Sequence, residues 1–292
     1  MIIDPFWPSE PEAHQRPPRS PIKNSPIVLI HGLWLTPRSW EGWKARFEQR
    51  GHEVLTPAWP RMDREVEALR RDPSVMNGLG ITEIVDHYDR IIRDLDTPPV
   101  IMGHSFGGLI TELLLDRGLG AAAVAVSPAQ IKGVLRLPPA QIRAVWPVLR
   151  NPVNRNRTVP LTAKQFRFRF TNTMNDADAD AAYRRYYVPG PGRVLFQAGL
   201  ANFNPKAVTK VDVHKDDRAP LLVLGNGADH TVPASVSKEA ATRLGKSKSV
   251  VDYKEFPGRP HFTAGAPGWE AVADYALQWA NSHVVVPERG RS

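Results

Sequence analysis

The stretch that decides the fold is PVIMGHSFGGLITELLLD, residues 99–116. Its apolar start predicts a buried strand over residues 99–103, and the residues after the serine predict a helix over 106–118. A strand that runs through Gly-His-Ser-Phe-Gly into a helix is the setting that holds a serine on a sharp, exposed turn. Gly103 and Gly107 lack the side chains that would collide there. Ser105 is therefore either a nucleophile or a small residue in a structural turn.

Strand and helix patterns alternate on both sides of this stretch. Before it, strands are predicted at residues 25–32 and 51–59, and helices at 37–50 and 80–96. After it, the predicted strands are residues 121–128, 219–227 and 249–258, and the predicted helices are 233–245 and 268–282. Repeated alternation of this kind predicts an α/β fold, with a mostly parallel sheet flanked by helices.

The alternation stops between residues 130 and 215, where Pro, Arg, Asn and aromatic residues accumulate. We interpret this segment as a cap inserted into the α/β core. Short helices are expected at residues 138–150, 162–174 and 178–189, with Asp178 and Asp180 near a helix start. The predicted organisation is an extended Pro-rich tail (1–25), a core (26–129 and 216–285), the cap (130–215) and a C-terminal tail (286–292).

The net charge of +8 is concentrated in the cap, where 15 Lys or Arg face 4 Asp or Glu; the remainder of the chain carries −3. A basic cap raises the hypothesis of anionic substrates. Within it, QFRFRF (165–170) alternates aromatic and basic residues, as a surface that stacks on nucleic acid would. An amphipathic cap element with Phe inward and Arg outward is the simpler interpretation, so no nucleic-acid partner is expected.

The composition excludes several other classes. Cysteine is absent, which rules out disulfides and thiolate chemistry and is compatible with the reducing cytoplasm where we expect the protein. No apolar run approaches the roughly 18 to 20 residues that span a bilayer, and the N-terminus does not resemble a secretory signal. No P-loop, zinc pattern or dinucleotide fingerprint occurs, so no metal or other cofactor is expected. The oligomeric state is not predicted.

A nucleophilic serine needs a histidine as base and an acid to orient that histidine. The loops after the last two predicted strands contain Asp229 and His261, at the strand ends where parallel sheets present catalytic groups. His230 adjoins the acid in sequence and His283 follows the last predicted helix, so both are poorer bases. Asp229 could instead cap the helix that starts near residues 231–233, and His261 could be a loop histidine bonded to backbone.

An oxyanion needs two preorganised donors, and the backbone N–H groups of Leu33 and Phe106 are the candidates. The helix that starts near Phe106 adds the positive end of its dipole. The side chains considered for the substrate pocket are Trp34, His31, His104, Phe166, Phe170 and Phe262. Trp34 could equally belong to the core, His31 is expected to have a local structural role, and His104 is expected to pack beside the strand end.

Four stretches together resemble the α/β-hydrolase family: IHGLW (30–34), GHSFGG (103–108), GNGADHTVP (225–233) and PHF (260–262). The resemblance covers residues 26–285. It implies a core of the eight-stranded type, a cap between strands six and seven, and Ser105, Asp229 and His261 as the catalytic triad. The first two antiparallel strands usual in the family are hard to find in residues 1–25. Relatives that open epoxides or cleave carbon–halogen bonds carry Asp at the nucleophile position, so Ser105 argues against both activities.

These residues predict a serine hydrolase that cleaves carboxylic esters or related acyl compounds through an acyl-enzyme on Ser105. His261 would be general base and then general acid, and Asp229 would hold the imidazole. The expected substrates are small to medium apolar or aromatic esters. The same triad serves acyl transfer, perhydrolysis and cyanohydrin cleavage in relatives, and the fold also serves as a small-molecule receptor. The sequence leaves these alternatives open.

Overall fold

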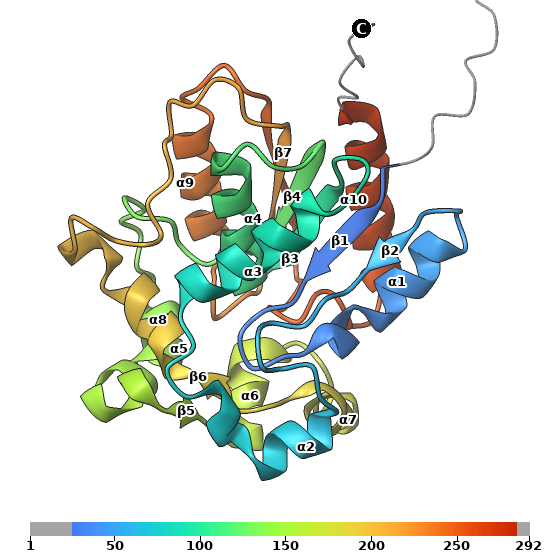
Figure 1. The fold of residues 1–292 in the computed structure, drawn as a ribbon. Helices are drawn as coiled ribbons and strands as arrows, with labels where there is room; N and C mark the ends of the chain where they lie inside the picture. The colour runs from blue at the N-terminus through green and yellow to red at the C-terminus, as the bar shows by residue number, and fades with distance from the viewer. Residues whose placement is uncertain (1–24, 285–292) are drawn as a thin grey trace, which may run out of the picture.

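The computed structural model describes residues 25–284, and its centre is a six-stranded sheet (Figure 1). Neighbouring strands are parallel throughout, in the spatial order β2-β1-β3-β4-β7-β8. The chain leaves β1 in one direction and returns to its other side with β3, and ligands of such sheets bind beside this switch point, at the carboxyl ends of the strands. The predicted α/β fold is confirmed. The strands are β1 (Ile27–Ile30), β2 (Val54–Leu55), β3 (Val100–His104), β4 (Ala122–Val126), β7 (Leu221–Asn226) and β8 (Val251–Phe256).

Helices cover both faces of the sheet because successive strand residues point to opposite sides. Ile27 and Leu29 of β1 pack in one apolar cluster with α1 and α10, whereas Val28 and Ile30 pack in the other with α3, α4 and α9. Figure 1 shows these two helix layers on either side of the strands. None of the helices in this described part of the chain is long and apolar enough to cross a membrane. The flanking helices are α1 (Glu41–Glu48), α3 (Ile81–Arg93), α4 (Phe106–Asp116), α9 (Ala234–Leu244) and α10 (Trp269–His283).

The chain between β4 and β7 forms a mainly helical cap over the carboxyl edge of the sheet (Figure 1). Among residues 25–284 the cap follows β4, the fourth strand of the sheet. The predicted position between strands six and seven includes two further strands, which the family resemblance places before β1. Residues 1–24 and 285–292, and with them nearly all of both predicted tails, lie outside the described part, and the domain boundaries stay a prediction. The cap elements are α5 (Pro139–Leu149), η3 (Pro152–Asn156), β5 (Thr158–Val159), α6 (Ala163–Phe170), α7 (Asp176–Tyr186), β6 (Gly190–Pro191), α8 (Gly192–Gly199) and η4 (Ala201–Phe203).

Several local predictions need correction. The helix predicted at residues 37–50 is split into η1 (Pro37–Trp40) and α1, and neither α2 (Val66–Arg71) nor α8 was expected. The last of the predicted cap helices starts at Asp176 rather than near Asp178, because the side chain of Asn175 caps it by accepting a hydrogen bond from the Asp178 N–H. Short helices of this kind depend on tertiary packing more than on their own propensity, so their local sequence signal is weak.

The stretch QFRFRF is helical; Phe166 and Phe170 point inward as expected, but Arg169 corrects the expectation that the Arg side chains point outward. In a helix, positions three or four apart share a face, so Phe166, Arg169 and Phe170 all point inward. The guanidinium of Arg169 donates to the backbone carbonyls of Ala144 at 2.8 Å and Gln165 at 3.1 Å. Burial lowers its pKa to about 10. Arg169 therefore holds α5 and α6 together inside the cap.

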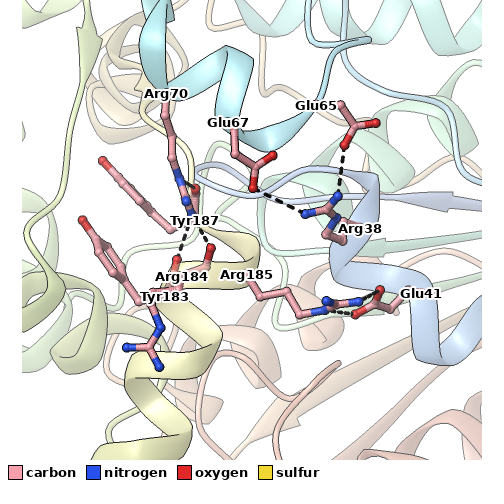
Figure 2. A network of polar contacts seen from close by, with 9 residues as sticks. All are labelled: Arg38, Glu41, Glu65, Glu67, Arg70, Tyr183, Arg184, Arg185 and Tyr187. Carbon is pink, nitrogen blue, oxygen red and sulfur yellow. Dashed lines mark hydrogen bonds and ion pairs between the residues drawn. The ribbon is translucent and has the colours of Figure 1, made fainter.

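Polar contacts attach the cap helix α7 to the core (Figure 2). The Arg185 guanidinium donates two hydrogen bonds of 2.6 Å to the Glu41 carboxylate at the start of α1. Arg70 of α2 donates to the backbone carbonyls of Arg184 and Tyr187, at 2.8 Å each. These carbonyls lie at the end of α7, where helix geometry leaves them without partners of their own. The contacts fix α7 against the core from two directions.

The turn from β3 into α4 is held by backbone packed against backbone. The backbone of Ser105 has φ 57° and ψ −119°, a conformation that residues other than Gly rarely adopt. A Cβ atom on Gly103 would lie 2.0 Å from the carbonyl oxygen of Gly107, and one on Gly107 would lie 2.1 Å from the carbonyl oxygen of Ile30. The helix therefore starts directly against β1, and only glycine fits at either position.

Glu112 in the middle of α4 is a buried carboxyl group, 1% exposed, and neither of its oxygens has a hydrogen-bond partner among residues 25–284. Burial raises the pKa of Glu112 well above its ordinary value of 4.5, and nearby Arg218 opposes this effect only in part. The folded state therefore binds more protons than the unfolded state above that pH. Stability consequently falls as the pH rises from about 4.5 towards the raised pKa.

Glu112→Gln should remove this dependence, because an amide cannot ionise. The free energy of unfolding at pH 7 should rise by about 1 kcal/mol or more, and the gain should vanish below about pH 4. Urea unfolding from pH 4 to pH 8 measures both. Glu53→Gln is the control, since Glu53 is exposed and forms no ion pair within the described residues. A Glu112→Gln protein with the wild-type pH profile would contradict the burial of a neutral carboxyl.

Gly107→Ala should lower the free energy of unfolding by about 3 kcal/mol or more, because the new methyl group overlaps the Ile30 carbonyl of β1. Urea unfolding monitored by circular dichroism measures the loss. Gly245→Ala is the matched control: Gly245 follows α9 with φ −72°, and its added Cβ would lie 3.3 Å from the nearest atom. Equal stability of the two variants would show that α4 is not seated on β1 as described.

Candidate active site

Ser105 lies between the carboxyl end of β3 and the first residue of α4. Its backbone is fixed on both sides, since its N–H donates to the Val126 carbonyl and its carbonyl accepts from the Ala129 N–H, both at 2.9 Å. A Cβ added to Gly32 would lie 3.0 Å from the Ser105 Cβ, so the loop after β1 adjoins the serine. The Ser105 hydroxyl has no hydrogen-bond partner among the described residues. The serine is held in place by its backbone, while its hydroxyl oxygen stays free.

Asp229 and His261 come from the loops after β7 and β8, and the structure brings them together. His261 Nδ1 lies 2.6 Å from Asp229 Oδ2, and both side chains are completely buried. The other carboxylate oxygen, Oδ1, accepts from the N–H groups of Thr231 at 2.7 Å and Val232 at 2.8 Å. Asp229 therefore orients the imidazole and also closes the turn before α9, but it does not cap that helix, whose N-cap is Pro233.

The free nitrogen of His261 is the notable feature of this pair. A carboxylate only accepts hydrogen bonds, so Nδ1 carries the proton that points to Asp229 and Nε2 presents a lone pair. Nε2 is buried and has no partner within residues 25–284. No hydrogen bond joins it to the Ser105 hydroxyl, and such bonds are commonly long in a substrate-free site and tighten on binding. The acceptor position of the imidazole is therefore open.

His104, the residue before Ser105, links the serine turn to the histidine loop. Its Nε2–H donates to the backbone carbonyl of His261 at 2.7 Å, and the two imidazole rings have centroids 4.7 Å apart. Burial, and then the positive charge of a protonated His261, hold the pKa of His104 well below its ordinary value. The neutral ring of His104 therefore ties the His261 loop to the serine turn without adding a charge to the site.

Two backbone donors adjoin the serine. Neither the N–H of Leu33 nor that of Phe106 donates a hydrogen bond to another described residue. Phe106 is the first residue of α4, where N–H groups are free by the geometry of a helix and the dipole favours negative charge. Leu33 follows Gly32 in the loop that adjoins Ser105. The structure thus leaves both candidate oxyanion donors free near the serine.

A cavity of about 280 Å³ opens beside Ser105, between the core and the cap helices α5 and α8. Its wall is mostly apolar, with Gln130 and Gln141 as its largest polar members, and none of its residues carries a charge. The cavity therefore does not support the expectation of anionic substrates. Its lining residues are Ser105, Phe106, Ala129, Gln130, Leu137, Gln141, Ile142, Val145, Trp146, Leu149, Leu195, Ala198, Gly199, Thr231 and Val232.

None of the six side chains considered for the pocket lines this cavity. His31 stacks on Trp59, with ring centroids 4.9 Å apart, and accepts from the Trp59 N–H at 3.2 Å. Burial lowers the pKa of His31 to about 4, so it stays neutral and structural. His104 is occupied with the His261 loop as described above.

The four aromatic candidates form the junction between cap and core instead. The Trp34 indole N–H donates to the Val159 carbonyl of the cap at 3.0 Å. Phe166 and Phe170 stack on each other with centroids 4.7 Å apart, and Phe262 packs on Tyr186 at 5.1 Å. Their aromatic character predicted that these side chains are buried, but it did not predict whether they line a pocket or pack at the junction of cap and core.

The residues that do line the cavity were missed, although one signal for them was present. Ile142, Val145, Trp146 and Leu149 are spaced three and four apart on α5, which marks one apolar helix face. The rejected bases lie elsewhere: His230 Nδ1 bonds the Phe168 carbonyl at 3.1 Å, and His283 stacks on Trp279 at the end of α10.

Comparison with known proteins identifies the family and the fold. The model of the alpha/beta hydrolase family matches residues 27–275. No curated protein matches the chain. An extracellular alpha/beta-hydrolase from a Paenibacillus species is 19% identical with a TM-score of 0.61, over 87% of this chain and 98% of that one. The Paleococcus ferrophilus monoacylglycerol lipase is 21% identical with a TM-score of 0.62, over 89% and 96%.

A pyrethroid hydrolase from Sphingobium faniae is 14% identical with a TM-score of 0.59, over 88% of this chain and 98% of that one. At such identities the likeness to solved structures shows the fold alone. The match of the family model, in contrast, extends from β1 into α10 and includes every strand of the described sheet. The chain therefore belongs to the alpha/beta hydrolase family.

Proposed function

We propose that the protein is a serine hydrolase of carboxylic esters, with Ser105 as nucleophile, His261 as base and Asp229 as the acid that orients the base. One observation carries the proposal: the imidazole of His261 is fixed by Asp229 through Nδ1, while its buried Nε2 has no partner among the described residues. An unpartnered basic nitrogen in a buried site costs free energy unless a substrate or nucleophile uses it. We assign that use to the Ser105 hydroxyl, because Ser105 directly follows His104, whose ring is bonded to the His261 carbonyl.

The reaction follows from these groups. The Ser105 oxygen attacks the ester carbonyl carbon while His261 Nε2 takes the hydroxyl proton, and Asp229 stabilises the imidazolium that forms. The resulting oxyanion accepts hydrogen bonds from the N–H groups of Leu33 and Phe106. The carbon–oxygen bond of the leaving alcohol then breaks as His261 returns its proton to that oxygen. Water repeats the sequence on the acyl-enzyme and releases the carboxylic acid and free Ser105.

The cavity supports uncharged, apolar substrates. An apolar wall without a charged residue stabilises acyl or aromatic groups by burial and offers a carboxylate no counter-charge. Among the similar solved structures are a lipase and a pyrethroid hydrolase, which is consistent with ester substrates. The chemistry described uses only groups of the protein and water. A cytoplasmic location, expected from the absence of cysteine, stays a prediction.

Ser105→Ala should abolish covalent labelling by a fluorophosphonate, because the phosphonylated oxygen is removed. The thermal unfolding midpoint should stay near that of the wild type, since the backbone contacts of the turn do not use the hydroxyl. Gel fluorescence of the labelled protein and calorimetry make the two measurements. Labelling that persists in a folded Ser105→Ala protein would overturn the assignment of the nucleophile.

His261→Ala should lower kcat/KM on an activated aryl ester by about 10³-fold or more, because the serine loses its base. His230→Ala is the matched control: it is adjacent to Asp229 in sequence but bonded to the Phe168 carbonyl, and it should keep most of the activity. Initial rates of phenolate release measure both variants. If the two histidine variants retained equal activity, the base would have to be another residue.

Product analysis separates hydrolysis from other reactions of the same triad. With an ester and a competing alcohol or hydrogen peroxide, a hydrolase yields mainly the carboxylic acid, whereas a predominant transferred ester or peracid would identify an acyltransferase or a perhydrolase. With a cyanohydrin as the substrate, release of an aldehyde and hydrogen cyanide would identify a lyase. Saturable ligand binding without a burst of acylation would indicate a receptor.

A further inference from the structure

The cap presents large apolar side chains to solvent around the opening of the cavity. Leu137, Ile142 and Trp146 line the cavity and are also 56%, 42% and 58% exposed. Further out, Leu135, Leu200 and Phe203 are 72%, 49% and 87% exposed. We name these six residues the docking face. Scattered exposed apolar residues are ordinary, but a contiguous group of this size marks an interaction surface.

The six residues are contiguous because the elements that carry them are tied together. The Asn202 side chain of η4 accepts from the Gly133 N–H at 2.7 Å and donates to the Val134 carbonyl at 2.8 Å. A Cβ on Gly199 would lie 3.0 Å from a Leu149 methyl carbon, so the end of α8 abuts the end of α5. Figure 1 shows α5 and α8 side by side in the cap. The docking face is thus one surface built from α5, the end of α8, η4 and the loop before α5.

The charged side chains in the segments that build the docking face are all basic. Residues 130–156 and 199–210 contain no Asp or Glu, and none of their basic side chains forms an ion pair with another described residue. Glu239 contacts the loop before α5, but its carboxylate accepts hydrogen bonds from the N–H groups of Leu135 and Arg136 and also forms an ion pair with Arg243. The basic residues are Lys132, Arg136, Arg143, Arg150, Arg155, Lys206 and Lys210.

The charges and the apolar side chains interleave. On α5, Arg143 and Arg150 lie three residues before and four after Trp146, which places all three on one stripe of the helix. Arg155 shares a shallow groove with Leu200 and Phe203. Apolar side chains surrounded by unpaired cations are the combination that enters a lipid interface while contacting anionic headgroups.

We propose that the docking face binds anionic lipid surfaces. The apolar side chains enter the headgroup and acyl boundary, and the surrounding Arg and Lys side chains contact the negative headgroups. Aliphatic Leu135, Leu137 and Leu200 gain from such a boundary but gain nothing from base stacking, which favours lipid over nucleic acid. Because the cavity opens within this face, apolar esters reach Ser105 from the lipid phase; this last consequence rests on the proposed function.

Vesicle sedimentation tests the docking. Full-length protein is mixed with vesicles of phosphatidylcholine alone or of phosphatidylcholine with phosphatidylglycerol. We expect partition to the anionic vesicles to be at least about tenfold stronger, and to fall about tenfold in Leu200→Ser/Phe203→Ser and in Arg150→Gln/Arg155→Gln. Val250→Ser and Lys246→Gln/Lys254→Gln are the matched controls, exposed residues on or beside β8 and after α9, and should partition as the wild type does.

Turnover separates this inference from the proposed function. None of the four substituted residues, Leu200, Phe203, Arg150 and Arg155, lines the cavity. Hydrolysis of a water-soluble ester should therefore be unchanged, while hydrolysis of an ester dissolved in anionic vesicles should fall with binding. Ser105→Ala protein should still sediment with anionic vesicles. If it does and the wild type cleaves no ester, the chemistry is wrong and the docking stands.

Three results would overturn the docking proposal. The first is equal binding of wild type and both double variants to anionic vesicles. The second is binding to an oligonucleotide, lost steeply with salt, without binding to vesicles. The third is a dimer by light scattering that dissociates in Leu200→Ser/Phe203→Ser, which would show that a second copy of the chain covers the face.

Discussion

The contact between the start of α4 and the backbone of β1 is the constraint on which the rest of the structure depends. With Gly103 and Gly107 in the turn, helix and strand approach until a single methyl group would overlap a carbonyl oxygen. That approach forces Ser105 into its strained conformation and leaves the first N–H of α4 free beside the serine. Strain of this kind persists only where surrounding packing enforces it, as the buried parallel sheet does here.

Around the turn, histidines with different environments have different tasks. His31 and His104 are buried without a carboxylate partner, and burial keeps both neutral by lowering the pKa of each. They hold the loops that follow β1 and β8. Of these three, only His261 is paired with a carboxylate, that of Asp229, and its Nε2 has no partner among the described residues. One buried site thus contains two neutral imidazoles that position loops and a third whose Nε2 is open.

The cap contains two different environments, an uncharged cavity and a basic outer surface, which its net charge alone does not distinguish. Its wall at the cavity carries no charge, and apart from buried Arg169 its positive charge lies on the outside around exposed apolar side chains. A basic segment therefore does not mean a basic pocket. A charge that is buried needs hydrogen-bond partners, and the Arg169 guanidinium donates to two backbone carbonyls.

Much of this protein was determined by its sequence alone, because the relevant signals are local. Strand and helix periodicity marked the parallel sheet, and the glycines around Ser105 marked the sharp turn. Asp229 and His261 were found because loops at the carboxyl ends of parallel strands converge, whatever the details of packing. The structure brings these two residues together, while their catalytic role stays a prediction.

Only the tertiary structure decided which cap residues face the cavity. Phe166, Phe170, Phe262 and Trp34 have the composition of a pocket, yet they pack at the junction of cap and core, and the stripe on α5 lines the cavity instead. The direction in which an apolar side chain points depends on how distant segments pack, and no local pattern encodes that. For the same reason α8 was not predicted, because it is a short helix that packing against its neighbours stabilises.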